Sequence, residues 1–115
     1  MGVTASPPTG YRYRDCEPAE VAEILAALTS PSRLGIVRLL ADTELDITDI
    51  ALRLGASVAT TSHHLGPLRR ARLVISRREG TRILNRLAGP HVLELCDAAC
   101  AATQQRRPAC TRFQQ

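Results

Sequence analysis

Four cysteines are the first residues of this 115-residue chain whose spacing could support chemistry. Cys96 and Cys100 are four residues apart in a stretch with helical spacing, so their Cβ atoms should be about 5–6 Å apart. A disulfide needs roughly 3.5–4.5 Å between Cβ atoms, so this pair suits a shared soft ion better. Cys110 follows in the C-terminal tail, and Cys16 precedes the first expected helix. We therefore treat all four as candidate metal ligands.

Three converging thiolates suit As(III) or Sb(III), and with a further donor Cd(II) or Pb(II), because soft sulfur prefers soft ions. As(III) is the first expectation, with no organic cofactor. An alternative is a redox or persulfide sensor that pairs Cys16 with another cysteine, because such pairs are not constrained by helical spacing. Cysteines on an apolar helix face are also often small core residues. Adjacent His63 and His64 would point about 100° apart on a helix and would chelate one ion poorly.

A basic segment provides the second candidate chemistry. Every basic residue other than histidine is an arginine, and seven arginines lie in residues 69–86, which contain one acid, Glu79. The acids cluster elsewhere, in residues 15–23 and 42–49. Such a segment beside a DNA-reading motif is the electrostatic signature of a nucleic-acid binder. The candidate DNA-binding residues are Ser57, Thr60, Ser62, His63, Arg69, Arg70, Arg77, Arg78 and Arg82.

The elements that must position these side chains centre on a predicted helix-turn-helix. Residues 46–54 combine a capping Asp46 with apolar residues at helical spacing. Gly55 suits the position just after a helix end, and Ser57 can cap the next helix. Small polar side chains let this second helix lie deep in a major groove, while arginines at its end reach phosphates. The residues expected to face inward on it are Val58, Thr61, Leu65 and Leu68.

The second helix of the motif has an irregular feature at Gly66 and Pro67. Proline has no N–H to donate to the carbonyl of His63, so the helix should kink or end early there.

Flanking elements complete the expected fold. Helices are predicted at about 18–28 and 31–41, each with an apolar stripe. Strand-like residues 73–77 and 81–87 flank a turn at 78–80 and predict a basic two-stranded wing. A helix at about 90–105 has an apolar side that nothing downstream covers, which predicts a homodimer. The predicted class is mainly α with a small β-hairpin: a winged helix-turn-helix of about five helices, dimeric through its terminal helices.

Composition sets the expected organisation. Residues 1–15 should form a flexible arm, residues 16–105 one DNA-binding and dimerisation domain, and residues 106–115 a flexible tail. No apolar run approaches membrane-spanning length and the first residues lack a signal-peptide core, so we expect a cytoplasmic protein that does not associate with membranes. Cytoplasmic cysteines are usually free thiols, ligands or sensors rather than structural disulfides.

Order of elements and motifs together resemble the ArsR/SmtB family of bacterial metal- and stress-responsive repressors, over about residues 22–95. The motifs are Leu-Thr-Ser-Pro-Ser-Arg-Leu at 28–34, Ser-His-His-Leu at 62–65, and the runs 70–74 and 77–80 leading into the wing. The resemblance implies a homodimer that occupies operator double-stranded DNA and leaves it when an inducer binds. It also places Ala59, Ser62 and His63 at base-contacting positions, where Ala59 offers no polar group.

Two metal sites common in that family are largely absent. Where the family has C-V-C-D, residues 46–49 read Asp-Ile-Thr-Asp. On the last helix, His91 matches a first histidine, but Gly89, Ala102 and Gln105 stand where the other ligands belong. One histidine is too few for a zinc or nickel site. The cysteines remain as the expected inducer site.

Two other classes of function fit parts of the sequence. A thiol-dependent reductase could use the cysteines, but no Cys-x-x-Cys opens a helix and no acid–base pair is evident. A dimerisation module without DNA binding would fit Ala59 and the irregular Gly66 and Pro67. We therefore expect a DNA-binding repressor, not an enzyme, that a thiophilic ion releases from its operator.

Overall fold

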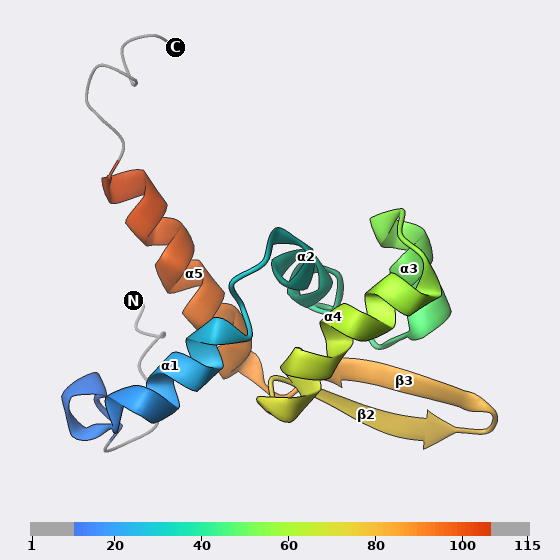
Figure 1. The fold of residues 1–115 in the computed structure, drawn as a ribbon, viewed down its shortest axis with the longest axis horizontal. Coiled ribbons are helices and arrows are strands. Elements are labelled where there is room, and N and C mark those ends of the chain that lie inside the picture. Colours follow the sequence, from blue (N-terminus) through green and yellow to red (C-terminus); the bar gives the residue numbers. More distant parts are fainter. Residues whose placement is uncertain (1–10, 107–115) are drawn as a thin grey trace, which may run out of the picture.

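The computed structural model describes residues 11–106 and shows a small helical domain with a protruding β-hairpin (Figure 1). The described elements are a 3-10 turn at Tyr13–Asp15, helices α1 (Pro18–Ala26), α2 (Pro31–Leu39), α3 (Ile47–Leu54), α4 (Val58–Arg70) and α5 (Pro90–Gln105), and strands β1 (Leu45–Asp46), β2 (Val74–Glu79) and β3 (Arg82–Leu87). The predicted winged helix-turn-helix class is confirmed. The boundaries of the arm at 1–15 and the tail at 106–115 stay predictions, because residues 1–10 and 107–115 lie outside the described range.

Local capping fixes the helix-turn-helix as the sequence predicts. Asp46 Oδ1 accepts from the backbone N–H of Asp49 at 2.9 Å, and Ser57 Oγ accepts from that of Thr60 at 3.0 Å. Each cap satisfies an N–H that has no partner inside its helix. Gly55 ends α3 with a φ of 70°, a left-handed conformation that favours glycine. These three residues therefore set where α3 begins, where it stops and where α4 begins.

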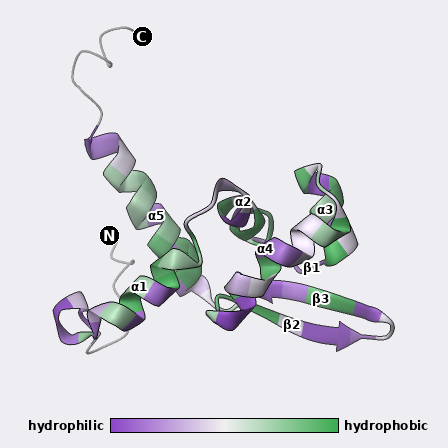
Figure 2. Cartoon of the chain, viewed as in Figure 1, coloured by the Kyte–Doolittle hydropathy of each residue, from purple (hydrophilic) through white to green (hydrophobic). Residues whose placement is uncertain are grey.

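The apolar core lies where α2, α3, α4 and the first turn of α5 meet the base of the wing. Ile36, Ile50, Leu65, Leu68 and Val92 are all fully buried. Burying a side chain of this size contributes about 1.5–3 kcal/mol. The colouring by hydropathy shows this apolar concentration on α2 and the start of α5, whereas β2 is largely hydrophilic toward its tip (Figure 2).

Two terminal elements contribute little to this core. No residue of α1 is buried, and Leu25 on it remains 45% exposed. Residues 97–106 of α5 and its C-terminal cap are likewise exposed. An apolar face that one chain leaves uncovered fits packing on a second copy. None of the helices in the described range is long and apolar enough to cross a membrane.

The wing belongs to a three-stranded sheet in the order β1-β3-β2, where the sequence predicted two strands. The short β1 pairs with β3, with Leu45 opposite Asn85. Two residues are too few to show the alternation that predicts a strand. The predicted turn at 78–80 is also wrong: β2 continues to Glu79, and Gly80 with Thr81 forms the turn, with φ of 64° at the glycine. A two-residue hairpin turn requires such a residue.

Strand register assigns the wing side chains to two faces, because opposite residues in an antiparallel pair share a face. The pairs on one face, here called the recognition-helix face, are Val74–Leu87, Ser76–Asn85 and Arg78–Ile83. The pairs on the other, here called the α3 face, are Ile75–Arg86, Arg77–Leu84 and Glu79–Arg82. The first face contacts α4 and the second contacts the start of α3, as the hydrogen bonds below establish.

The recognition helix α4 differs from its prediction at Pro67. The prediction there was a kink or an early end; the helix continues through this proline to Arg70, so an early end is wrong and a kink stays a prediction. The proline removes one backbone hydrogen bond, but Leu65 and Leu68 on either side are fully buried, and this packing keeps the segment helical.

Three smaller corrections concern helix ends and burial. The first two helices end at Ala26 and Leu39, two residues before the predicted ends at 28 and 41. Val58, predicted to face inward, is 47% exposed, because it lies in the first turn of α4, before that helix enters the core.

Arg72 joins α4 to β2 in a strained conformation. Its φ is 60°, and among the described residues it is the only non-glycine with positive φ. The backbone N–H of Leu73 donates to the carbonyl of Leu68 at 2.9 Å, a bond that closes the helix around this left-handed residue. An L-residue costs about 1–2 kcal/mol in this conformation.

We expect Arg72→Gly to raise the free energy of unfolding by about 0.5–1 kcal/mol, since the relief of strain outweighs the larger entropy of glycine in the unfolded chain. Urea denaturation at one fixed protein concentration measures the change. Ala71, with φ of −80°, provides the matched control, and Ala71→Gly should lower stability. Equal effects of the two substitutions would contradict the assignment of strain to Arg72.

Candidate nucleic-acid interface and inducer site

The outward face of α4 carries the residues predicted to read DNA. Thr60, Ser62 and His63 are all exposed. Ser57 donates to the Thr60 hydroxyl at 2.9 Å, which holds these two side chains at the start of the helix. None of the side-chain hydrogen bonds among the described residues involves Ser62 or His63. The structure thus leaves small polar side chains available on the side of α4 that faces away from the core.

Arg69, predicted to reach a phosphate, instead lies against the wing. Its Nε donates to Ser76 Oγ at 3.0 Å and its Nη2 to Asn85 Oδ1 at 2.7 Å. Ser76 also donates to Asn85 Oδ1 at 2.8 Å, and Asn85 Nδ2 donates to the Leu45 carbonyl at 3.1 Å. Asn85 is not among the residues predicted from the sequence, although asparagine is uncommon inside strands and could have drawn notice.

Two other predicted phosphate ligands are engaged on the α3 face of the wing. Arg77 donates to both carboxylate oxygens of Glu44, at 2.8 and 2.7 Å. Arg82 contacts Asp46 at 3.1 Å and Asp49 at 3.6 Å. The hydrogen bond from Arg77 is the largest cause of the lowered pKa of Glu44, whereas the backbone N–H of Asp49 is the largest cause of the lowered pKa of Asp46. Both arginines are therefore partly neutralised by the protein itself.

Arg70 and Arg78 are the predicted arginines that are exposed and make neither a side-chain hydrogen bond nor an ion pair among the described residues. Arg70 folds back along α4: a Cβ added at Gly66 would lie 3.2 Å from its Nη1, so the glycine makes room for this side chain. Arg78 lies on the recognition-helix face, opposite Ile83, which is 47% exposed. Strand register therefore singles out Arg78 as the wing arginine on the same side as α4.

The candidate thiolate ligands are not gathered in the described part of one chain. Cys96 is half-buried against the core, Cys100 is exposed one helical turn later, and Cys16 is exposed with its Sγ donating to the Arg12 carbonyl at 3.3 Å. Within residues 11–106, no group of three or more His, Cys, Asp or Glu side chains could hold a metal ion. Cys110 lies outside the described residues. A three-thiolate site therefore needs Cys110 or a second chain.

The environment of Cys96 favours the protonated thiol over the thiolate. Burial raises the pKa of this thiol, and the neighbouring Asp97 carboxylate raises it further. A neutral thiol is a weak nucleophile, and a metal ion must displace its proton in order to bind.

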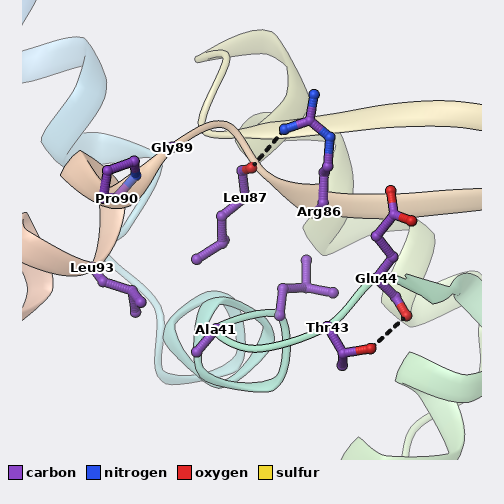
Figure 3. A pocket seen from close by; sticks show the side chains of 9 residues that line it. Ala41, Thr43, Glu44, Arg86, Leu87, Gly89, Pro90 and Leu93 are labelled. Carbon is purple, nitrogen blue, oxygen red and sulfur yellow. Dashed lines mark hydrogen bonds between the residues drawn. The ribbon is translucent and has the colours of Figure 1, made fainter.

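A pocket of about 410 Å³ lies between the end of α2 with its following loop and the junction of β3 with α5 (Figure 3). Its described lining residues, none of them a cysteine, are Leu40, Ala41, Thr43, Glu44, Arg86, Leu87, Gly89, Pro90 and Leu93. Arg86 points away from the pocket and donates to the Leu87 carbonyl at 3.3 Å. The pocket is therefore not the thiolate site. Its walls include Leu87 and Pro90, which flank the short link between β3 and α5 at residues 88–89.

Residues 30–76 match the family model described as bacterial regulatory protein, arsR family. The HTH-type transcriptional regulator KmtR of Mycobacterium tuberculosis is 35% identical over 92 residues, covering 80% of this chain and 71% of the relative. The transcriptional repressor SmtB homolog of Synechocystis is 41% identical over 76 residues, covering 66% and 58%. The cadmium resistance transcriptional regulatory protein CadC homolog of Staphylococcus aureus is 34% identical over 83 residues, covering 71% and 69%.

A solved structure agrees with this assignment. The homodimeric winged helix-turn-helix DNA-binding domain of a possible ArsR-family transcriptional regulator from Mycobacterium bovis superposes with a TM-score of 0.71 at 34% identity, covering 78% of this chain and 83% of that one. The fold and exposed recognition helix thus define a winged helix-turn-helix regulator that binds DNA. The chain belongs to the bacterial arsR family of transcriptional regulators. It is a regulator and not an enzyme, which excludes the reductase alternative.

The carboxylates on the α3 face predict an acid-sensitive wing. Because the folded pKa values of Glu44 and Asp46 are lowered, their contribution to stability is fully present above the ordinary carboxyl range, about pH 4, and is lost as pH falls through the folded values. Urea unfolding followed from neutral to acid pH should show a smaller loss for Glu44→Gln than for the wild type. Asp42→Asn, in an exposed loop, is the control. Identical profiles for wild type and Glu44→Gln would refute this origin.

Proposed function

We propose that this protein is a cytoplasmic, homodimeric transcriptional repressor that leaves its operator when a thiophilic metal or metalloid ion binds cysteine thiolates on α5. The observation that carries the DNA-binding part is the exposed polar face of α4 beside the free guanidinium of Arg78. In the dimer, the two α4 helices enter successive major grooves about 34 Å apart. Ser62 and His63 face base edges, while Arg70 and Arg78 contact phosphates.

The inducer part of the proposal rests on Cys96 and Cys100. These residues lie one turn apart on α5, with Cys96 at the edge of the core. A third thiolate comes from Cys110 or Cys16, in the same or the partner chain. As(III), Sb(III), Cd(II) and Pb(II) match such soft ligands, with As(III) suited to three thiolates. The relative named for cadmium resistance supports a soft ion as inducer.

The proposed release mechanism has two states. Binding of the ion draws the terminal segments toward α5 and shifts this helix. Residues 88–89 transmit the shift, because they join α5 directly to β3 of the wing. The separation of the two recognition helices changes, and the dimer leaves the operator. Coupling of this kind is typically about 1–3 kcal/mol and reciprocal, so operator DNA weakens inducer binding by the same factor.

Substitution of the two neighbouring wing arginines tests the DNA interface. Arg78→Ala should weaken binding to all duplexes and reduce the slope of log affinity against log salt by about 0.9 for each phosphate that the variant no longer neutralises. Arg77→Ala, which removes an arginine already paired with Glu44, should leave that slope nearly unchanged. Fluorescence anisotropy between about 50 and 200 mM salt measures both, with a duplex that the wild type selects from a random-sequence pool. Equal slope changes for the two variants would remove the distinction between the two faces of the wing.

Anaerobic titration of the reduced protein with As(III), Cd(II) and Zn(II) tests the inducer. We expect thiolate-to-metal absorbance to rise in step with release of the selected duplex, and Zn(II) to act least. Cd(II) and Zn(II) must displace the proton of a Cys96 thiol whose pKa is raised, so binding of these two ions should strengthen as pH rises. Cys96→Ser should retain DNA affinity and lose release, with Cys16→Ser and Cys110→Ser identifying the third ligand.

The same two readouts, with persulfide or peroxide added in place of the ion, distinguish the metal proposal from the redox alternative. The exposed thiols of Cys16 and Cys100 favour that alternative. Release by persulfide or peroxide without a thiolate band would replace the metal proposal by a cysteine-pair sensor. Loss of DNA affinity in Cys96→Ser with retained release would refute the role given to Cys96.

A further inference from the structure

The side chain of Asn85 is buried, with 1% of its surface exposed, in the middle of the wing sheet. It accepts from Arg69 and Ser76 through Oδ1 and donates to the Leu45 carbonyl through Nδ2. One residue thus joins the last turn of α4 to all three strands. A buried amide that loses its partners is destabilising, so the position of this side chain is closely tied to the groups it bonds.

We propose that Asn85 is a positioning residue for DNA binding: with Arg69 and Ser76 it fixes the angle between the wing and α4 at which both elements contact one duplex. This inference rests on the proposed DNA interface. Arg69 acts in it as a structural cation that connects α4 to the wing, and not as a phosphate ligand.

Strand register links this network to the phosphate contact. Ser76 and Asn85 form one opposite pair on the recognition-helix face, and Arg78 and Ile83 form the next pair on that face toward the tip. Two residues along a strand span about 7 Å. A tilt of the sheet at Asn85 therefore displaces the guanidinium of Arg78 relative to α4.

The other anchors of the wing are weaker candidates for setting this angle. The ion pairs of Arg77 and Arg82 lie on the α3 face and have exposed arginines, with 47% and 54% of their side-chain surface accessible. Exposed pairs of this kind contribute little and are screened by salt. The amide of Asn85 is shielded from water, and Arg69 and Ser76 both donate to its one oxygen, so these bonds define a single geometry.

The composition of the strand supports a role beyond packing. Asparagine is depleted in strands, and an apolar residue at a buried position needs no hydrogen-bond partners. Here the chain instead uses an asparagine together with one arginine of its basic segment. The pairing of a buried asparagine with an arginine is accounted for by the fixed angle that its hydrogen bonds impose between α4 and the wing, and not by burial alone.

A double-mutant cycle tests the inference. Affinity and salt slope are measured for the wild type, Arg78→Ala, Asn85→Leu and the double variant, with the duplex selected by the wild type. Leucine has nearly the shape of asparagine but makes none of its hydrogen bonds. We expect Asn85→Leu to reduce the salt slope as Arg78→Ala does, and Arg78→Ala to cause no further loss in the Asn85→Leu background.

A milder matched pair keeps the test valid if Asn85→Leu does not fold, which urea denaturation would reveal. Ser76→Ala removes the shared hydroxyl, whereas Ser76→Thr retains it. The loss caused by Arg78→Ala should shrink in Ser76→Ala and stay at its wild-type size in Ser76→Thr.

The outcomes distinguish this inference from the proposed function. Additive losses in both cycles, with a functional wild type, would overturn the positioning role of Asn85 and leave the DNA interface intact. Absence of salt-dependent binding by the wild type would overturn the proposed function and the positioning role with it.

Discussion

The hydrogen bonds of Asn85 are the constraint on which the arrangement of the DNA-binding surface depends. They hold the end of α4 against β2 and β3 and the carbonyl of β1. The helix and the hairpin also share apolar core residues such as Leu68 and Val74, whose contacts are non-directional. The apolar core therefore brings the two elements together, and the buried polar network gives them one relative orientation.

This division also explains how the basic segment is used. Its charge has the footprint of a phosphate-binding surface, yet three of its arginines, Arg69, Arg77 and Arg82, bond to the protein's own side chains. Those contacts hold the wing in place from both faces, so Arg78 can extend from a fixed support. A guanidinium presented in this way loses less side-chain freedom when it meets a phosphate, which favours binding.

Local chemistry in the sequence was sufficient to predict the helix-turn-helix and α5. Capping by Asp46 and Ser57 and the left-handed Gly55 depend on residues within one turn of each other. Which arginines bond to the protein's own side chains was not predictable in this way. Arg69 and its partner Asn85 are 16 residues apart, and Asn85 and its partner Leu45 are 40 apart. Continuation of α4 past Pro67 was missed for the same reason, since tertiary packing outweighs the local cost of proline.

The position of the cysteines follows from the same principle of long-range assembly. Cys96 lies on the side of α5 that packs on the core, while the exposed half of the helix is free to meet a partner. Under the proposed function, a segment that carries Cys110 or Cys16, in the same or the partner chain, completes the thiolate site on α5. Since α5 joins β3 through residues 88–89, and β3 carries Asn85, closing that site would act on the same strand that orients the wing. In the proposed mechanism, dimer packing, ion binding and the DNA-binding surface are linked through this one short connection.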